Sequence, residues 1–291
     1  MKGKLLTLLL LLITSFSVTG CVLMDNSTPF QESKKSTNPP LESWGWKEIA
    51  PGLTYSDVHI NLSTNPELPE NKDLILVKID PKLYTFEVYQ NYEQESAKTI
   101  QEIHEQTNSL LSFNGGFFTE EFTPTGLLIS NGHELRQISY ADLLDGVLTI
   151  DKNGNTNFFS HQDLQSNPQI TPQKYHFAIQ NGPVLINQYS QIEITRDTGK
   201  KASRTAIGID KDGNIVLIIL KQSLLNTDNT ISLYKFAHLL QEISPIKDLG
   251  LHSVLNLDGG PSTGLIIDDK YYPEMEKVQN VVLVKLRPVG V

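Results

Sequence analysis

The sequence predicts an α+β fold, a single domain with a mainly antiparallel or mixed β-sheet and a few packed helices. Three observations predict it: strand-like apolar segments dominate the chain, hairpin signals join neighbouring ones, and only two segments have helical periodicity. Strands and helices do not alternate regularly, so a parallel sheet built from strand–helix units is not indicated. The chain shows no internal repeat, and we expect one folded domain over residues 44–291.

The first strands are expected over residues 53–62, 74–80 and 84–90, where apolar residues alternate or run together between turn residues. Later strands are joined by three hairpin signals: Asn131-Gly132, Lys152-Asn153-Gly154 and Asp212-Gly213. Asn-Gly and Asp-Gly supply the positive φ angles that tight hairpin turns require. Four carboxylates are expected at exposed hairpin turns, namely Asp210, Asp212, Asp268 and Asp269.

Two helices are expected, over residues 95–107 and 230–243. The first places Ile100, Ile103 and His104 on one face. The apolar face of the second consists of Leu233, Phe236, Ala237 and Leu240. Asn229 or Thr230 is expected to cap the start of this second helix.

The chain is acidic, with 24 basic and 33 acidic residues among 291 and a formal net charge of −9. A nucleic-acid partner needs a basic surface, so this balance argues against one. Cys21 is the only cysteine, which excludes an internal disulfide. The fold must therefore depend on its hydrophobic core.

The first 21 residues have the layout of an export signal. Lys2 and Lys4 precede an aliphatic run over residues 5–13, which is too short to span a bilayer because a spanning helix needs about 20 apolar residues. The following Val18-Thr19-Gly20-Cys21 resembles the lipobox of bacterial lipoproteins, which implies cleavage before Cys21 and lipid attached to its thiol. An ordinary signal peptide followed by an unrelated cysteine is the alternative.

We therefore expect a signal peptide over residues 1–20, then a lipidated Cys21 and a flexible polar linker over residues 21–43. Attached lipid chains anchor a protein to a membrane surface. The expected location is the bacterial cell envelope. The outer membrane or cell surface is favoured, because Val22 stands where inner-membrane lipoproteins often have Asp.

Three apolar segments end in polar loops that contain glycine. These loops are Asn114-Gly115-Gly116, Gln180-Asn181-Gly182-Pro183 and the residues from Asn256 to Thr263. A fourth apolar segment, SRTAIGID, carries Arg204 near its start, and a guanidinium suits phosphate or carboxylate. Glycine lets main-chain N–H groups approach a ligand, while Asn, Gln and Asp add donors and acceptors. Each loop taken alone is also explained as a turn.

The blocks FNGGFF, RTAIGIDKDGNIVLI and LNLDGGPSTGL, in this order, resemble the signature blocks of the phosphodiester glycosidase family over most of residues 75–286. The resemblance implies a hydrolase that breaks the bond between a sugar's anomeric carbon and a phosphate oxygen. It also implies a substrate such as an N-acetylglucosamine-1-phosphodiester in an envelope glycan or exopolysaccharide. Pro261 departs from the pattern, since the family often has a third glycine there, and this bears on which sugar the pocket accepts.

The resemblance also suggests roles for individual residues. Asp258 is expected to act as nucleophile or general base, Arg204 to hold the phosphate, and Asn114 and Asn256 to orient sugar groups. An anion pocket is expected from the N–H groups of Gly115, Gly116, Gly259 and Gly260. Further substrate contacts are expected from Gln180, Asn181, Gly182, Ser262 and Thr263. The alternatives are that Asp258 accepts N–H groups of its own turn and that Arg204 makes an ion pair.

No cofactor is indicated, and the seven histidines form no metal-binding arrangement. Carboxylate and carbonyl oxygens near Asp258 suit Ca²⁺ or Mg²⁺, so a divalent cation stays open. Two other functions also stay open. One is a lipoprotein that binds a glycan without turnover. The other is a hydrolase or transferase acting on ordinary glycosidic bonds, which needs a second carboxylate near Asp258, such as Glu120 or Glu121.

Overall fold

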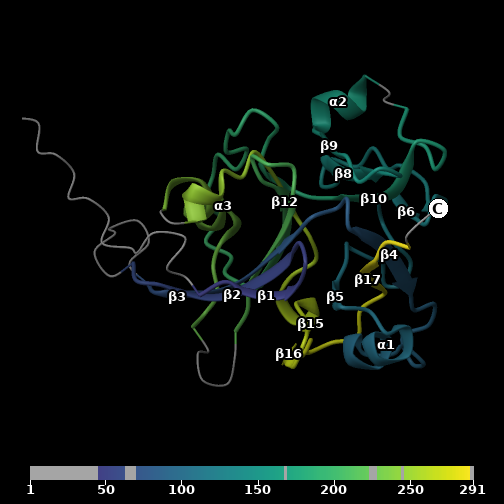
Figure 1. Ribbon diagram of the computed structural model, residues 1–291. Helices are drawn as coiled ribbons and strands as arrows, with labels where there is room; N and C mark the ends of the chain where they lie inside the picture. Colours follow the sequence, from purple (N-terminus) through teal and green to yellow (C-terminus); the bar gives the residue numbers. More distant parts are fainter. Residues whose placement is uncertain (1–44, 63–69, 167–168, 223–227, 244–245, 289–291) are drawn as a thin grey trace, which may run out of the picture. The chain divides into compact units, whose positions relative to one another are not determined.

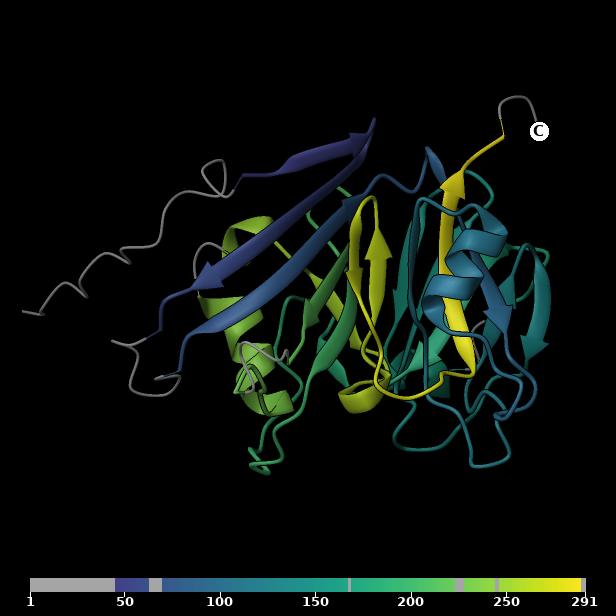
Figure 2. The same ribbon diagram turned by 90° about the horizontal axis from the view of Figure 1, so that it is seen from below.

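Three β-sheets and three α-helices make up the described part of the chain (Figures 1 and 2). The computed structural model describes residues 45–62, 70–166, 169–222, 228–243 and 246–288. Every strand pair within these ranges is antiparallel, so the expected antiparallel sheet is confirmed and a mixed sheet is not formed. The fold is mostly β, with fewer helical residues than the α+β prediction implied.

The largest sheet has seven strands. In spatial order they are β1 (Lys47–Ala50), β2 (Leu53–Ile60), β3 (Lys72–Ile79), β13 (Ile215–Leu220), β12 (Arg204–Ile209), β14 (Ser253–Asn256) and β11 (Val184–Ile186). β13, with the sequence IVLIIL, is buried along its whole length. It has no polar face because the sheet is covered on both sides, as an unbroken apolar strand requires.

The other two sheets have five strands each. The second contains β7 (His133–Arg136), β6 (Leu128–Ser130), β10 (Tyr175–Asn181), β8 (Gly146–Asp151) and β9 (Thr156–Phe159). The third contains β16 (Lys270–Tyr272), β15 (Leu265–Ile267), β5 (Leu111–Asn114), β17 (Asn280–Leu286) and β4 (Tyr84–Gln90). The strands expected over 53–62, 74–80 and 84–90 are therefore confirmed as β2, β3 and β4.

One central core joins the inner faces of all three sheets. It includes Ile207 from the first sheet, Phe177 from the second and Phe113 from the third, all fully buried. Each sheet also has a smaller apolar cluster on its other face, and a helix packs there. Figure 1 shows the three helices at separate positions around the sheets. Each sheet thus has a layer on both faces, which removes apolar surface from water.

The helices are α1 (Ile100–Thr107), α2 (His161–Gln165) and α3 (Leu233–Glu242), with 3₁₀ turns η2 (Ile246–Leu249) and η3 (Gly260–Ser262). α1 starts later than expected because Thr99 forms a capping box with Glu102. α3 is capped by Ser232, so the expected cap at Asn229 or Thr230 is wrong. The side chain of Asn229 instead donates to the carbonyls of Asp73 and Lys221. The short helix α2 was not expected.

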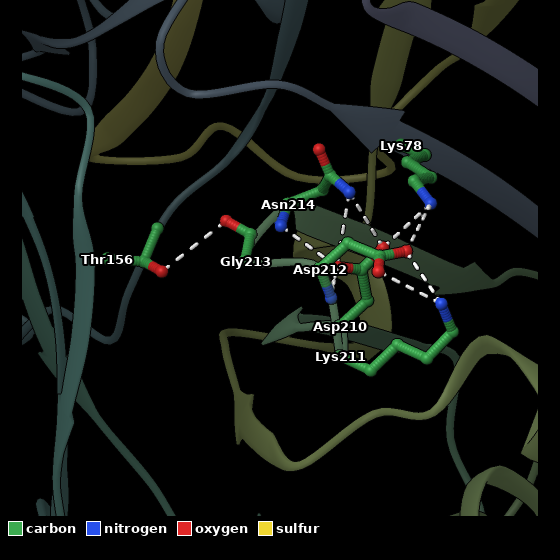
Figure 3. Close-up of polar contacts among 7 residues, drawn as sticks. All are labelled: Lys78, Thr156, Asp210, Lys211, Asp212, Gly213 and Asn214. Atoms are coloured by element: carbon green, nitrogen blue, oxygen red, sulfur yellow. Dashed lines mark hydrogen bonds and ion pairs between the residues drawn. The ribbon is translucent and has the colours of Figure 1, made fainter.

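The turn between β12 and β13 corrects one expectation about exposed carboxylates. Asp212, Asp268 and Asp269 are exposed, but the side chain of Asp210 is only 1% exposed. Asp210 accepts hydrogen bonds from the Asp212 and Asn214 amides and pairs with Lys78 at 2.8 Å (Figure 3). The buried carboxylate therefore holds the amides of the turn and links the turn to β3 through Lys78.

Candidate active site

Three strands, one from each sheet, end side by side in polar loops. β5 ends at Asn114, β10 at Asn181 and β14 at Asn256. Asn114 Nδ2 donates to the carbonyl of Asp258 at 2.8 Å, and Asn181 Nδ2 donates to the carbonyl of Asn256 at 2.8 Å. The three glycine-containing loops singled out in the sequence are therefore joined to one another by hydrogen bonds.

Asn114 is the central connector of these loops. Its side chain is fully buried, and its Oδ1 accepts from Thr205 Oγ1 at 2.8 Å and from the Gly264 amide at 3.2 Å. With the bond to Asp258, both ends of the amide are used. The geometry makes Asn114 a positioning residue beneath Asp258, with its polar atoms already occupied.

Gly115 and Gly116 pack against Asn280 at the start of β17. The Gly115 amide donates to the Asn280 carbonyl at 3.0 Å, and the Gly116 amide donates to Asn280 Oδ1 at 2.8 Å. A Cβ on Gly115 would lie 1.9 Å from Asn280 Oδ1. Asn280 is not among the site residues expected from the sequence, although an amide that opens an apolar strand, as in QNVVLV, is a signal for such a residue.

The second loop is held by its amide side chains. Gln180 Oε1 accepts from the Leu127 and Ser139 amides, and its Nε2 donates to the carbonyls of Ser139 and Leu144. Asn181 Oδ1 accepts from the Phe117 amide at 2.8 Å. These two expected substrate contacts are buried and already bonded within the protein.

Asn256 links the second loop to the third and keeps one free atom. Its Nδ2 donates to the Gly182 carbonyl at 3.0 Å. Its Oδ1 is buried and has no partner in the described part of the chain, and the same holds for Oγ1 of Thr263. Buried polar atoms are nearly always bonded, so these two acceptors mark places where a ligand or water belongs.

Asp258 lies half-buried at the junction of the loops. Its amide donates to the Gly115 carbonyl at 3.2 Å, and its Oδ1 accepts from the Gly259 amide at 2.9 Å. Burial raises the pKa of its carboxyl, while hydrogen bonds from Ser262 and Gly259 lower it and repulsion from Glu276 raises it further. The net pKa lies above the usual range, as for a carboxylate adapted to take up a proton.

The four glycine amides expected to line an anion pocket are all used inside the protein. Gly115 and Gly116 donate to Asn280, Gly259 donates to Asp258, and Gly260 donates to the Ser203 carbonyl at 2.9 Å. None of these N–H groups is free for an anion in this structure. Glycine is needed at Gly115 for close packing, whereas Gly260 has a positive φ of 60°.

Arg204 lies beside the Asp258 loop but does not bond to Asp258. Its Nε donates to the Ile231 carbonyl at 3.0 Å and its Nη2 to the Lys200 carbonyl at 2.9 Å. Burial lowers the pKa of the guanidinium. Its neighbour Thr205 bonds Asn114, and adjacent residues of a strand face opposite sides, so the Arg204 side chain leaves β12 on the other face of the sheet.

Two charged residues near this site were missed by the sequence analysis. Lys221, directly after β13, donates to the Thr263 carbonyl at 2.7 Å, and burial lowers its pKa while Glu274 raises it. Glu276 is close enough to Asp258 to raise the pKa of that carboxyl. Glu120 and Glu121, the expected second carboxylates, are exposed, and a Thr119 hydrogen bond lowers the pKa of Glu121.

Among the described residues, no three His, Cys, Asp or Glu side chains gather as a metal site would require. None of the helices in these ranges is long and apolar enough to cross a membrane. Cys21, the signal peptide over 1–20 and the linker over 21–43 lie outside the described residues.

Sequence comparisons identify similar proteins. The profile of the phosphodiester glycosidase family matches residues 107–289, more than half of the chain. The uncharacterized protein YigE of Escherichia coli (strain K12) is 25% identical over 137 residues, which are 43% of this chain and 50% of that protein. The matched region thus spans half the length of this relative.

Two solved structures have a similar fold. The catalytic domain of zebrafish N-acetylglucosamine-1-phosphodiester α-N-acetylglucosaminidase, auto-inhibited by its pro-peptide, is 18% identical with a TM-score of 0.63, covering 83% of this chain and 86% of that one. A hypothetical protein from Synechocystis is 16% identical with a TM-score of 0.61, covering 86% of this chain and 64% of that one. At these identities the likeness shows a shared fold.

Proposed function

The chain belongs to the phosphodiester glycosidase family, and we propose that it is an exported, lipid-anchored hydrolase that cleaves the bond between a sugar's anomeric carbon and a phosphate oxygen. The observation that supports this most is Asp258, a half-buried carboxylate with a raised pKa at the junction of three loops, within the matched region. The proposed substrate class is a sugar-1-phosphodiester, such as one of N-acetylglucosamine, in an envelope glycan or exopolysaccharide.

Asp258 is proposed to act as general base. Its carboxylate takes a proton from water, the water oxygen bonds to the anomeric carbon, and the bond from that carbon to the phosphate oxygen breaks. The departing phosphate monoester keeps the electron pair and is a weak base, so it leaves with little help from an acid. A raised pKa makes an ionised carboxylate a stronger base, which suits this step.

A nucleophilic role for Asp258 is the other route. Its oxygen would bond to the anomeric carbon, and water would then cleave that bond in a second step. The two routes give opposite anomers of the first-formed sugar. Proton NMR of the product, recorded before the anomers equilibrate, distinguishes them.

The phosphate is proposed to bind a cation near Asp258. Lys221 is the first candidate, and Arg204, which the sequence suggested but whose side chain leaves β12 on the other face of the sheet, is the second. Arg204 keeps Nη1 without a protein hydrogen bond in the described ranges, and Lys221 reaches Thr263 next to η3. The substitutions Arg204→Gln and Lys221→Gln show which of the two cations binds the phosphate. The variant that loses the phosphate contact raises KM for a phosphodiester, while the other leaves KM near the wild-type value.

The test of the proposed function uses sugar-1-(4-nitrophenyl phosphate) diesters of several sugars. Cleavage at the anomeric carbon releases 4-nitrophenyl phosphate and free sugar, whereas cleavage at phosphorus releases nitrophenol and sugar phosphate. Asp258→Asn should lower kcat by a factor of about 100 or more with the fold intact, the scale of a directly acting base. Turnover that survives this substitution, or a variant that no longer folds, would contradict the proposal.

The anchor is tested separately. Cys21→Ala should move the protein from the membrane fraction to the soluble exported fraction and abolish labelling by palmitate, because one thiol carries the proposed lipid.

A divalent cation is tested by assaying activity with and without EDTA. Activity that falls with EDTA and returns with Ca²⁺ or Mg²⁺ supports a cation.

A second candidate function is hydrolysis or transfer at ordinary glycosidic bonds. It is favoured by Glu276, since such bonds need a general acid beside the first carboxylate. The wild type would then hydrolyse 4-nitrophenyl glycosides, which contain no phosphate. Glu276→Gln would abolish this turnover. Binding of a glycan without any turnover would favour a binding lipoprotein instead.

A further inference from the structure

A polar cavity lies beside the loop that contains Gly182. It has a volume of about 320 Å³, and its lining includes Asp145, His161, Gln188, Tyr189 and Glu193. Pockets that bind small ligands measure about 300–1,000 Å³, so the cavity is large enough for one.

The cavity is attached to the candidate active site by one short segment. Asp145 lines the cavity, and its Oδ1 accepts from the Val184 amide at 2.8 Å. A Cβ on Gly182 would lie 2.7 Å from the same oxygen. The Gly182 carbonyl in turn accepts from Asn256 of the active site. Successive Cα atoms are about 3.8 Å apart, so Asn181 and Val184 lie within about 11 Å of each other.

The lining is suited to a sugar that carries no negative charge. No lysine or arginine is among the described residues that line the cavity, whereas two carboxylates are. Burial raises the pKa of Asp145, the Val184 amide and His161 lower it, and Glu193 raises it. The carboxylates of Asp145 and Glu193 would both repel an anionic ligand. Carboxylate and amide groups bind vicinal hydroxyls, and amines as well.

Two further details favour a saccharide. The ring of Tyr189 is 72% exposed, and an exposed ring beside polar groups can stack on the apolar face of a pyranose. Gln188 Oε1 is buried without a hydrogen-bond partner in the described part of the chain, while its Nε2 donates to Asp163. A ligand hydroxyl would supply the missing donor.

We propose that this cavity is a saccharide subsite, which holds one uncharged or amino sugar unit of a glycan chain whose phosphodiester lies at Asp258. The proposal rests on the proposed function and narrows it, because a second subsite means that the substrate is a polymer rather than a single sugar.

Binding without turnover is the first test. The wild-type protein is titrated with pentamers of N-acetylglucosamine, glucosamine and glucose in a calorimeter, and Tyr189→Ala and Gln188→Ala are titrated alongside. Tyr92→Ala is the matched control, since Tyr92 is similarly exposed, at 77%, but does not line the cavity. Tyr189→Ala should raise Kd for the binding pentamer by on the order of 10-fold, and Tyr92→Ala should leave it unchanged. If no pentamer binds the wild type, the subsite is overturned.

Turnover is the second test. Release of 4-nitrophenyl phosphate is compared between a diester of one sugar and a diester of its tetramer. The wild type should prefer the tetramer in kcat/KM, and Tyr189→Ala should remove that preference while leaving the one-sugar substrate unaffected. Equal kcat/KM for both substrates in the wild type, or an equal fall on both in Tyr189→Ala, would overturn the subsite. No turnover of either substrate would contradict the proposed function, and the titrations would still decide the subsite.

Discussion

Asparagine side chains hold the candidate active site together. Four asparagine side chains make hydrogen bonds to backbone outside their own segment: Asn114, Asn181, Asn256 and Asn280. An amide carries a donor and an acceptor, so one side chain can satisfy two backbone groups of opposite kind. Aspartate has the same shape without the donor, which makes these positions specific for asparagine.

Asn114→Asp should test this specificity. It replaces the donor to the Asp258 carbonyl, 2.8 Å away, with an oxygen that cannot donate when ionised, inside a fully buried position. We expect a loss of about 3 kcal/mol or more in the free energy of unfolding at neutral pH. Thr205→Val is the control, because it removes one donor to Asn114 and should cost about 1 kcal/mol. Urea denaturation measures both, and equal losses would contradict the argument.

The carboxylate of Glu276 should tune the pH dependence of activity. Its repulsion contributes to the raised pKa of Asp258, and Asp258 must be ionised to act as a base. Removing that negative charge by Glu276→Gln lowers the pKa of Asp258, so the acid limb of the kcat/KM profile should move to lower pH. Glu120→Gln, at an exposed loop position, should leave the limb in place. A limb that moves upward or stays fixed in Glu276→Gln would refute this coupling.

Hairpins are the elements that the sequence predicts best. At Asn131-Gly132 both residues have positive φ, 51° and 69°, as expected for a two-residue turn between β6 and β7. In the turn after β12 only Gly213 has a positive φ, and the buried Asp210 carboxylate accepts hydrogen bonds from the amides of the turn. The sequence pattern locates such a turn but does not reveal that Lys78, on a different hairpin, pairs with its first carboxylate.

The Asp210 turn should be sensitive to pH (Figure 3). Burial raises the pKa of Asp210, but hydrogen bonds from Lys78 and Asn214 lower it more, so the net pKa is below the usual range. A carboxylate whose pKa is lower in the folded state than in the unfolded state stabilises the fold at pH values above the unfolded-state pKa. This stabilisation is lost as the pH falls through the folded-state pKa. Asp210→Asn should thus cost about 2 kcal/mol at pH 7 and less in acid, as measured by urea denaturation. A pH-independent difference would contradict it.

Glycines in two of the loops have different reasons to be glycine. A Cβ on Gly115 would overlap Asn280 Oδ1 at 1.9 Å, whereas a Cβ on Gly260 would meet open space. Gly115→Ala should therefore cost about 3 kcal/mol or more, because the buried Asn280 side chain must move and lose its hydrogen bond from the Gly116 amide. Gly260→Ala should cost about 1 kcal/mol, the strain of alanine at a φ of 60°. Thermal denaturation compares them, and a larger loss in Gly260→Ala would reverse the interpretation.

At the scale of the whole molecule, the sequence predicts strands but not how they are divided among sheets. β5 pairs with β15 and β17, which come near the end of the chain, and β3 pairs with β13. No local pattern encodes such distant partners, since pairing depends on which apolar faces meet. The same limit applies to the site. Asp258 and the loops could be predicted from sequence blocks, whereas Asn280 and Glu276 are brought to the site only by long-range packing.

Because the three sheets share one core, they should unfold together. Phe177 of the second sheet packs against Phe86 of the third, with ring centroids 5.5 Å apart, in the core that also contains Ile207 of the first. Phe177→Ala should cost about 4 kcal/mol. Trp46 packs on the outer cluster of the first sheet, so tryptophan fluorescence reports that region when the second tryptophan is removed by Trp44→Phe.

If the core is shared, fluorescence and far-UV circular dichroism should shift to the same lower urea midpoint in Phe177→Ala. A fluorescence midpoint that stays at the wild-type value while the dichroism midpoint falls would show that the first sheet is stable without the others.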